Sequence, residues 1–143
     1  MEAVGTKAGA GPALWAGPVV AVGLLLSAGA FYERFDAPRS GREYLFCHAS
    51  EAVDHLTFTA LALVLAAVIA SVVGGIVVWW SKPRNAVLPL CCMAAVVALL
   101  MAADGVDAHG ESRAAEIAAQ GFTEVGCDYT PQVYDATPGW FSW

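Results

Sequence analysis

The chain has 143 residues, of which 58% are hydrophobic and only 14% are charged, and its formal net charge is −6. A soluble domain carries about 25% charged residues, so this composition does not fit an ordinary soluble domain. The acidic balance also argues against nucleic acid as a partner, because phosphate binding needs clustered Lys and Arg.

Three long uncharged stretches dominate the chain. Residues 8–32, 56–81 and 85–103 contain no Asp, Glu, Lys or Arg. A helix rises about 1.5 Å per residue, so about 20 residues cross a hydrocarbon core of about 30 Å. The sequence therefore predicts an all-α integral membrane protein with three transmembrane helices.

The predicted segments follow from these stretches and their flanking turn residues. They are a cytoplasmic N-terminus (1–11), transmembrane helix 1 (12–32), an outer loop (33–54), transmembrane helix 2 (55–81), an inner turn (82–85), transmembrane helix 3 (86–103) and an outer C-terminal segment (104–143) with a short helix and an extended tail. The inner turn is so short that the second and third helices must form an antiparallel hairpin.

The first helix has an alternative interpretation. Its apolar run is followed by Ala28–Gly29–Ala30, which resembles the cleavage site of a secretory signal. The stretch is long for a signal, however, and an uncleaved anchor gives the same topology. Trp15 and Tyr32 near its two ends fit the aromatic belts that border a bilayer.

The second helix is expected to begin near Ser50, whose side chain can cap the first free amides. It is expected to end at Trp79 and Trp80, because adjacent Trp residues followed by Lys82 are typical of a membrane interface. Lys7, Lys82 and Arg84 favour the cytoplasmic side for the N-terminus and the inner turn. The C-terminus is then outside the membrane.

The third helix is expected to stop near Ala103. Gly105 and Gly110 argue against one unbroken helix, and residues 112–120 are expected to form a second, short helix. The remaining segment, 122–143, contains two Pro residues and is expected to be extended.

Small residues at every fourth position predict where the helices pack, because lipid gives little hydrophobic drive for helix association. They indicate a tight contact between helices 2 and 3, although a stripe could equally face a partner subunit. The alternative is that Ala is simply common in this chain. The predicted packing residues are Ala62, Ala66, Ala70, Gly74, Ala94, Ala98 and Ala102.

Four cysteines are present. Cys47 and Cys127 fall in the two segments expected on the outer side, where an oxidising compartment would join them in a disulfide. The alternative is two unpaired thiols. Cys91 and Cys92 are adjacent on a helix and point in different directions, so plain packing explains them better than metal binding.

The titratable residues give little indication of chemistry. No Asp, Glu, Lys, Arg or His lies in the middle of a predicted span, where such a residue usually marks a proton or ion pathway. A redox or cofactor role for His48, His55 or His109 is a third possibility, but their spacing matches no ligand motif. We therefore predict no enzyme activity, no metal site and no cofactor.

The aromatic residues of the C-terminal segment are its most suggestive feature, since aromatic side chains are favoured anchors at interfaces. They could dock on a partner, fold back on segment 33–55, or lie among lipid headgroups. The predicted partner-binding residues are Tyr129, Tyr134, Trp140, Phe141 and Trp143.

These patterns predict a non-catalytic accessory or assembly subunit of a larger membrane protein complex. Its partners would be other integral membrane subunits and the lipid bilayer. The alternative is a stand-alone receptor or adhesion-like protein that binds a ligand on a disulfide-linked outer surface. The membrane is that of a bacterial cell, a eukaryotic cell or an organelle.

Overall fold

The computed structural model describes residues 13–36, 42–80, 87–120, 127, 131–137 and 139–141. Within these ranges the chain forms three helices and two short strands, and most of it is helical. In chain order the elements are α1 (Ala13–Asp36), β1 (Glu43–Phe46), α2 (Glu51–Trp80), α3 (Val87–Ala118) and β2 (Gln132–Asp135).

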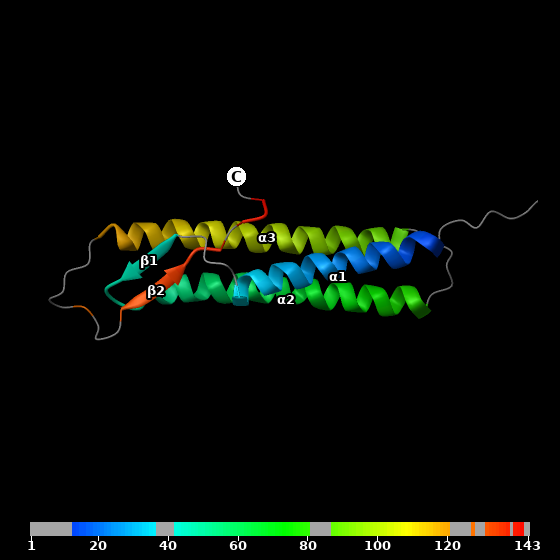
Figure 1. The fold of residues 1–143 in the computed structure, drawn as a ribbon, viewed down its shortest axis with the longest axis horizontal. Coiled ribbons are helices and arrows are strands. Elements are labelled where there is room, and N and C mark those ends of the chain that lie inside the picture. The colour runs from blue at the N-terminus through cyan, green and yellow to red at the C-terminus, as the bar shows by residue number, and fades with distance from the viewer. Residues whose placement is uncertain are drawn as a thin grey trace, which may run out of the picture.

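The three helices lie side by side along the long axis of the molecule, and α2 runs antiparallel to α3 (Figure 1). α1 is shorter and covers only part of this pair. The strands β1 and β2 lie over the part that α1 does not reach (Figure 1). We call this the strand end of the bundle. The opposite end, where α2 stops at Trp80 and α3 starts at Val87, is the link end.

Two helices, α2 and α3, are long and apolar enough to cross a membrane. Their most apolar windows have mean hydropathies of 2.8 and 2.2, and only 22% of the residues in each window are buried inside the protein. Most residues in these windows are therefore exposed or half-buried. Within the described ranges no further helix passes the same test, so the expected span at 12–32 stays a prediction.

α3 continues without interruption to Ala118, so the predicted break at Gly105 and Gly110 is wrong. The residues expected to form a separate helix at 112–120 are largely the last turns of α3. A Cβ on Gly110 would lie 3.1 Å from the hydroxyl oxygen of Tyr134, so close packing of β2 explains the glycine there. No atom lies within 4 Å of the corresponding position at Gly105, and nothing in the structure explains that residue.

The fold is also not purely helical, because β1 and β2 form a two-stranded antiparallel sheet. The register pairs Glu43 with Asp135 at one end and Phe46 with Gln132 at the other. Side chains alternate between the two faces of a strand. Phe46 points inward, where it is 1% exposed and packs with Val53 of α2 and Ala114 of α3. This small second core fixes the sheet on the helices.

The face of α2 that packs inward differs from the predicted stripe. Ala62 is exposed, Ala66 and Ala70 are half-buried, and only Gly74 of the four predicted residues is buried. From Ala60 onward the buried positions are spaced alternately by four and three residues. The buried residues of α2 are Val53, Ala60, Val64, Ala67, Ser71 and Gly74.

The prediction for α3 is wrong at every position, because Ala94, Ala98 and Ala102 are all exposed. Positions spaced by four rotate about 40° per step around a helix, whereas a pair crossing at a shallow angle keeps contact at a mean spacing of about 3.5. Residue size alone therefore does not show which face of α3 packs against the other helices. The buried residues of α3 are Pro89, Val96, Leu100, Ala103, Asp104, Gly110 and Ala114.

α1 contacts α2 through a pair of buried hydroxyls. The Oγ atoms of Ser27 and Ser71 lie 3.1 Å apart, and these residues are 0% and 3% exposed. Ser27 Oγ also lies 2.7 Å from the carbonyl oxygen of Gly23, and Ser71 Oγ lies 2.9 Å from that of Ala67. The two hydroxyl hydrogens can fill two of these three contacts at a time, so each serine donates one hydrogen bond in an otherwise apolar interface.

The buried face of α3 gives a direct test of helix packing. Ala103 is 0% exposed, whereas the neighbouring Ala102 is exposed. We expect Ala103→Leu to lower the free energy of unfolding by about 1–3 kcal/mol, because it overpacks a filled interface. Ala102→Leu is the matched control and should leave stability unchanged. Denaturation of the purified protein in detergent measures both, and equal effects would contradict the observed packing.

Candidate functional site

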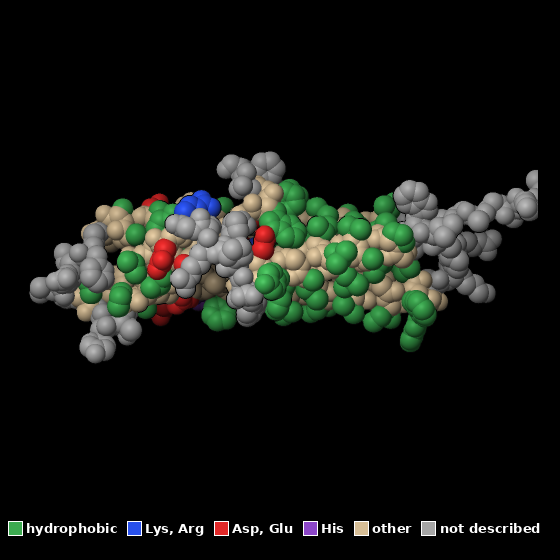
Figure 2. Space-filling model, in the orientation of Figure 1, with side chains coloured by type: hydrophobic (Ala, Val, Ile, Leu, Met, Phe, Trp, Pro, Cys, Tyr) green, Lys and Arg blue, Asp and Glu red, His purple; other side chains and the backbone are tan. Residues whose placement is uncertain are grey.

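Charged side chains gather at the strand end, and apolar side chains cover the rest of the visible face (Figure 2). Arg34, near the end of α1, forms an ion pair with Asp107 of α3. Both side chains are nearly buried, at 11% and 12% exposed. Arg34 Nη1 also donates to the carbonyl oxygen of Ala30 at 3.0 Å. This pair ties the strand end of α1 to α3.

Asp104, one turn before Asp107, binds the C-terminal segment. Its carboxylate accepts hydrogen bonds from the backbone N–H groups of Phe141 at 2.9 Å and Trp140 at 3.2 Å. The ring of Trp140 lies against α1, where a Cβ on Gly29 would be 3.1 Å from its Cη2 atom. A buried carboxylate thus holds the backbone of this segment on the helices.

Glu111 holds the strands against α3. Its Oε1 atom accepts a hydrogen bond from the hydroxyl of Tyr44 at 3.0 Å and forms an ion pair with Arg42 Nη1 at 2.9 Å. The hydrogen bond to Glu111 is the main cause that raises the pKa of Tyr44 above its ordinary value. Both contacts come from residues in or next to β1.

Gln132 of β2 secures the first turn of α2. Its Oε1 atom accepts a hydrogen bond from the backbone N–H of Ser50 at 2.8 Å, and its Nε2 atom donates to Asp54 at 2.7 Å. The carbonyl oxygen of Ser50 accepts hydrogen bonds from the N–H groups of Val53 and Asp54, so α2 begins next to Ser50, as the sequence predicted. The side chain that holds this first turn comes from a strand far along the chain.

Cys47 and Cys127 are joined in the disulfide that the sequence predicted, with Cα atoms 4.6 Å apart. Cys47 directly follows β1, and Cys127 precedes β2 by a few residues. The disulfide therefore closes the sheet at the same end as the Phe46–Gln132 pair. It belongs to the structural framework of the strand end.

The described aromatic residues of the C-terminal segment make contacts within the chain. Tyr134 faces the ring of Tyr44, with ring centroids 6.4 Å apart, and packs on Gly110. Trp140 and Phe141 are held by Asp104, although Trp140 remains 40% exposed. Tyr134 therefore contacts segment 33–55, as one of the three alternatives had it, whereas Trp140 and Phe141 contact α3 and α1 instead. Tyr129 and Trp143 lie outside the described residues.

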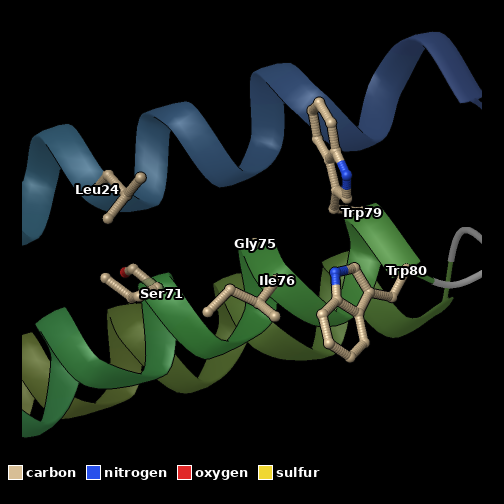
Figure 3. A pocket seen from close by; sticks show the side chains of 7 residues that line it. Leu24, Ser71, Gly75, Ile76, Trp79 and Trp80 are labelled. Carbon is tan, nitrogen blue, oxygen red and sulfur yellow. The ribbon is translucent and has the colours of Figure 1, made fainter.

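An open apolar groove of about 350 Å³ runs between α1 and α2 toward the link end (Figure 3). Leu24 and Ser71 stand at one end of it, Gly75 and Ile76 in the middle, and two indole rings at the other (Figure 3). We call it the indole groove. Its lining residues are Leu24, Ser71, Val72, Gly75, Ile76, Trp79 and Trp80.

The remaining candidate ligands stay apart. Among the described residues, His, Cys, Asp and Glu side chains form no group of three that could hold a metal ion. Cys91 is exposed, whereas Cys92 is half-buried and approaches Gly74, where a Cβ would lie 3.0 Å from its sulfur. Cys92 therefore packs in the helix interface.

Comparison with known proteins finds no family model that matches the chain and no similar curated protein or solved structure.

The roles of Asp104, Asp107 and Gln132 were not predicted from the sequence. One signal for the first two was present, because Arg34 follows the first uncharged stretch and Asp104 ends the third. Residues of opposite charge therefore lie close to the outer ends of two predicted spans. No comparable signal pointed to Gln132, because its contacts depend on the strand register.

The buried ion pair predicts unequal effects of two similar substitutions. Arg34→Met leaves Asp107 nearly buried without its cation, so we expect the free energy of unfolding to fall by about 3–5 kcal/mol. Arg113→Met breaks an exposed pair, in which the side chains are 56% and 64% exposed, and should cost at most about 1 kcal/mol. Thermal unfolding in detergent measures both. The double variant Arg34→Met/Asp107→Leu should recover stability, and a failure of this rescue would refute the pairing.

The strand end also predicts a loss of stability at high pH. Burial, followed by the charges of Asp107 and Glu111, raises the pKa of Tyr134 to about 12. The unfolded chain ionises this phenol near its ordinary pKa of about 10, so its contribution is present below pH 10 and is lost as the pH rises toward 12. Tyr134→Phe should flatten this decline in unfolding experiments across that range. An unchanged slope would contradict the assigned burial.

Proposed function

We propose that the chain is an integral membrane protein whose α1, α2 and α3 cross the bilayer. Support comes from the apolar windows of α2 and α3, in which only 22% of the residues are buried inside the protein. The core helix of a soluble protein buries most of its apolar side chains, so these helices need apolar surroundings.

Exposed aromatic residues on α2 match the thickness of a bilayer. Phe58 is 71% exposed and Trp79 is 87% exposed, and the helical rise places them about 31 Å apart along the axis. This distance equals the hydrocarbon thickness of about 30 Å, and aromatic rings favour both of its borders. The rest of α2 and the charged strand end would then project from the membrane.

The orientation follows from charge and redox chemistry. Lys82 and Arg84 lie in the sequence between α2 and α3, and such residues favour the cytoplasmic side. The strand end, with its Cys47–Cys127 disulfide, then faces an oxidising compartment in which this bond persists. The N-terminus is inside and the C-terminus outside.

Within this architecture we propose that the protein is a non-catalytic accessory or assembly subunit of a larger membrane complex. The observation that carries the proposal is a smooth outward face on α3. Ala94, Ala98 and Ala102 are exposed there and share this face with Gly105. Small residues at helix surfaces let another transmembrane helix approach closely, and the hairpin does not use this face itself.

The strand end supports a structural role. Its ion pairs and hydrogen bonds join Arg34 to Asp107, Arg42 to Glu111 and Gln132 to α2 within the same chain. Groups engaged in this way hold elements together and are poorly placed for proton transfer to a substrate. Such a rigid cap would fix the orientation of the helices that a partner recognises.

One observation favours the alternative, a receptor that binds a ligand on its disulfide-linked outer surface. Leu45 and Val133 are paired across the sheet and are 51% and 48% exposed. Together they form an apolar spot at the strand end. Binding of a ligand by the reconstituted protein without any membrane partner would favour this function.

Affinity purification from native membranes in mild detergent tests the accessory role. We expect the full-length chain to elute together with other integral membrane proteins. Ala98→Phe should remove them, because a large side chain blocks close helix contact. Ala62→Phe, at an exposed alanine of α2, is the matched control and should retain them. Elution of the unmodified protein as a stable monomer would contradict the proposal.

A further inference from the structure

The indole groove combines an apolar channel with hydrogen-bond donors at one end. Its wall is formed by Leu24 of α1 and by Val72 and Ile76 of α2, which are 37%, 45% and 51% exposed. Trp79 and Trp80 stand at the other end, and each indole carries one N–H donor (Figure 3). An apolar channel ending in donors matches an amphiphile with an acyl chain and an oxygen-rich headgroup.

Gly75 shapes the middle of the groove. A Cβ at this position would lie 3.1 Å from Cγ1 of Val20 on α1, so the glycine keeps α1 and α2 close beneath the channel. The groove remains open on the outside, which suits a chain that enters sideways from a bilayer. Between Ser71 and Trp80 it extends about 13 Å along the helix, a length that accommodates part of an acyl chain.

The charged residues that follow Trp80 in the sequence indicate the sign of the headgroup charge. Lys82 and Arg84 follow Trp80 closely in the sequence, and no acidic residue occurs between Asp54 and Asp104. The segment 81–86, which joins α2 and α3 in the sequence, therefore has a net charge of +2. Juxtamembrane Lys and Arg attract anionic lipids.

We propose that the indole groove binds one acyl chain of an anionic glycerophospholipid, with the ester and phosphate oxygens at the Trp79 and Trp80 end. This binding rests on the proposed membrane insertion but not on the accessory role. The apolar wall holds the chain, the indole N–H groups donate to headgroup oxygens, and the positive charge that follows Trp80 in the sequence favours the anionic species.

Neighbouring residues provide a matched pair of variants. Val72 lines the groove, whereas Val73 is similarly exposed, at 51%, and does not line it. Native mass spectrometry of the delipidated full-length protein, titrated with phosphatidylglycerol or phosphatidylcholine, gives the affinity for each lipid. We expect tighter binding of phosphatidylglycerol, a loss of about tenfold in Val72→Trp, and no change in Val73→Trp. Equal affinities in the two variants would overturn the site.

Two further measurements test the indole donors and the identity of the molecule in the groove separately. Trp79→Phe/Trp80→Phe keeps the rings but removes the donors, so it should weaken phosphatidylglycerol binding; unchanged affinity would overturn the headgroup assignment. A photoreactive benzoylphenylalanine at position 72 identifies the occupant in native membranes. An adduct of one phospholipid supports the proposal, whereas an adduct of protein size assigns the groove to a partner helix and overturns it. Neither result depends on whether Ala98→Phe releases a partner.

Discussion

Close approach of α2 and α3 is the interaction on which the rest of the structure depends. Ala67, Gly74 and Ala103 are buried between the helices, and their small size lets the backbones pack tightly. The paired helices provide the surface on which α1 docks through Ser27. On α3, the carboxylate of Asp104 attaches the C-terminal segment, that of Asp107 attaches α1, and that of Glu111 attaches the sheet. The strand end is therefore organised by a helix pair whose own contacts are almost entirely apolar.

The molecule divides its chemistry along its length. Toward the link end, many apolar side chains are exposed, and among the described residues the buried side-chain hydrogen bonds come from hydroxyls such as those of Ser27 and Ser71. At the strand end, ion pairs, amide hydrogen bonds and a disulfide hold short strands that could not persist alone. This division is the physical basis for placing one part in lipid and the other in water. It also leaves three apolar surfaces exposed, namely the small-residue face of α3, the indole groove and the Leu45–Val133 spot.

The sequence located the two long apolar helices, α2 and α3, because hydrophobicity is a local property, although it ended the second of them too early, at Ala103. It failed for the packing faces, since an almost uniformly apolar helix carries no polar side to show which face is buried. Choosing small residues at spacing four selected Ala94, Ala98 and Ala102, whereas Val96, Leu100 and Ala103 fill the interface. The sheet was missed because each strand has four residues and depends on distant partners such as Val53 and Ala114. The disulfide was foreseen because the predicted topology placed Cys47 and Cys127 on one side, in an oxidising compartment.

The most direct test of the account is the location of the two chain termini. Protease-cleavable tags at each end, assayed in sealed membrane vesicles of known orientation, report the side on which each terminus lies. Three spans with the strand end outside predict that the N-terminal tag is cleaved only from the cytoplasmic side and the C-terminal tag only from the opposite side. Cleavage of both tags from one side, or release of the protein from membranes by alkaline carbonate, would contradict the account.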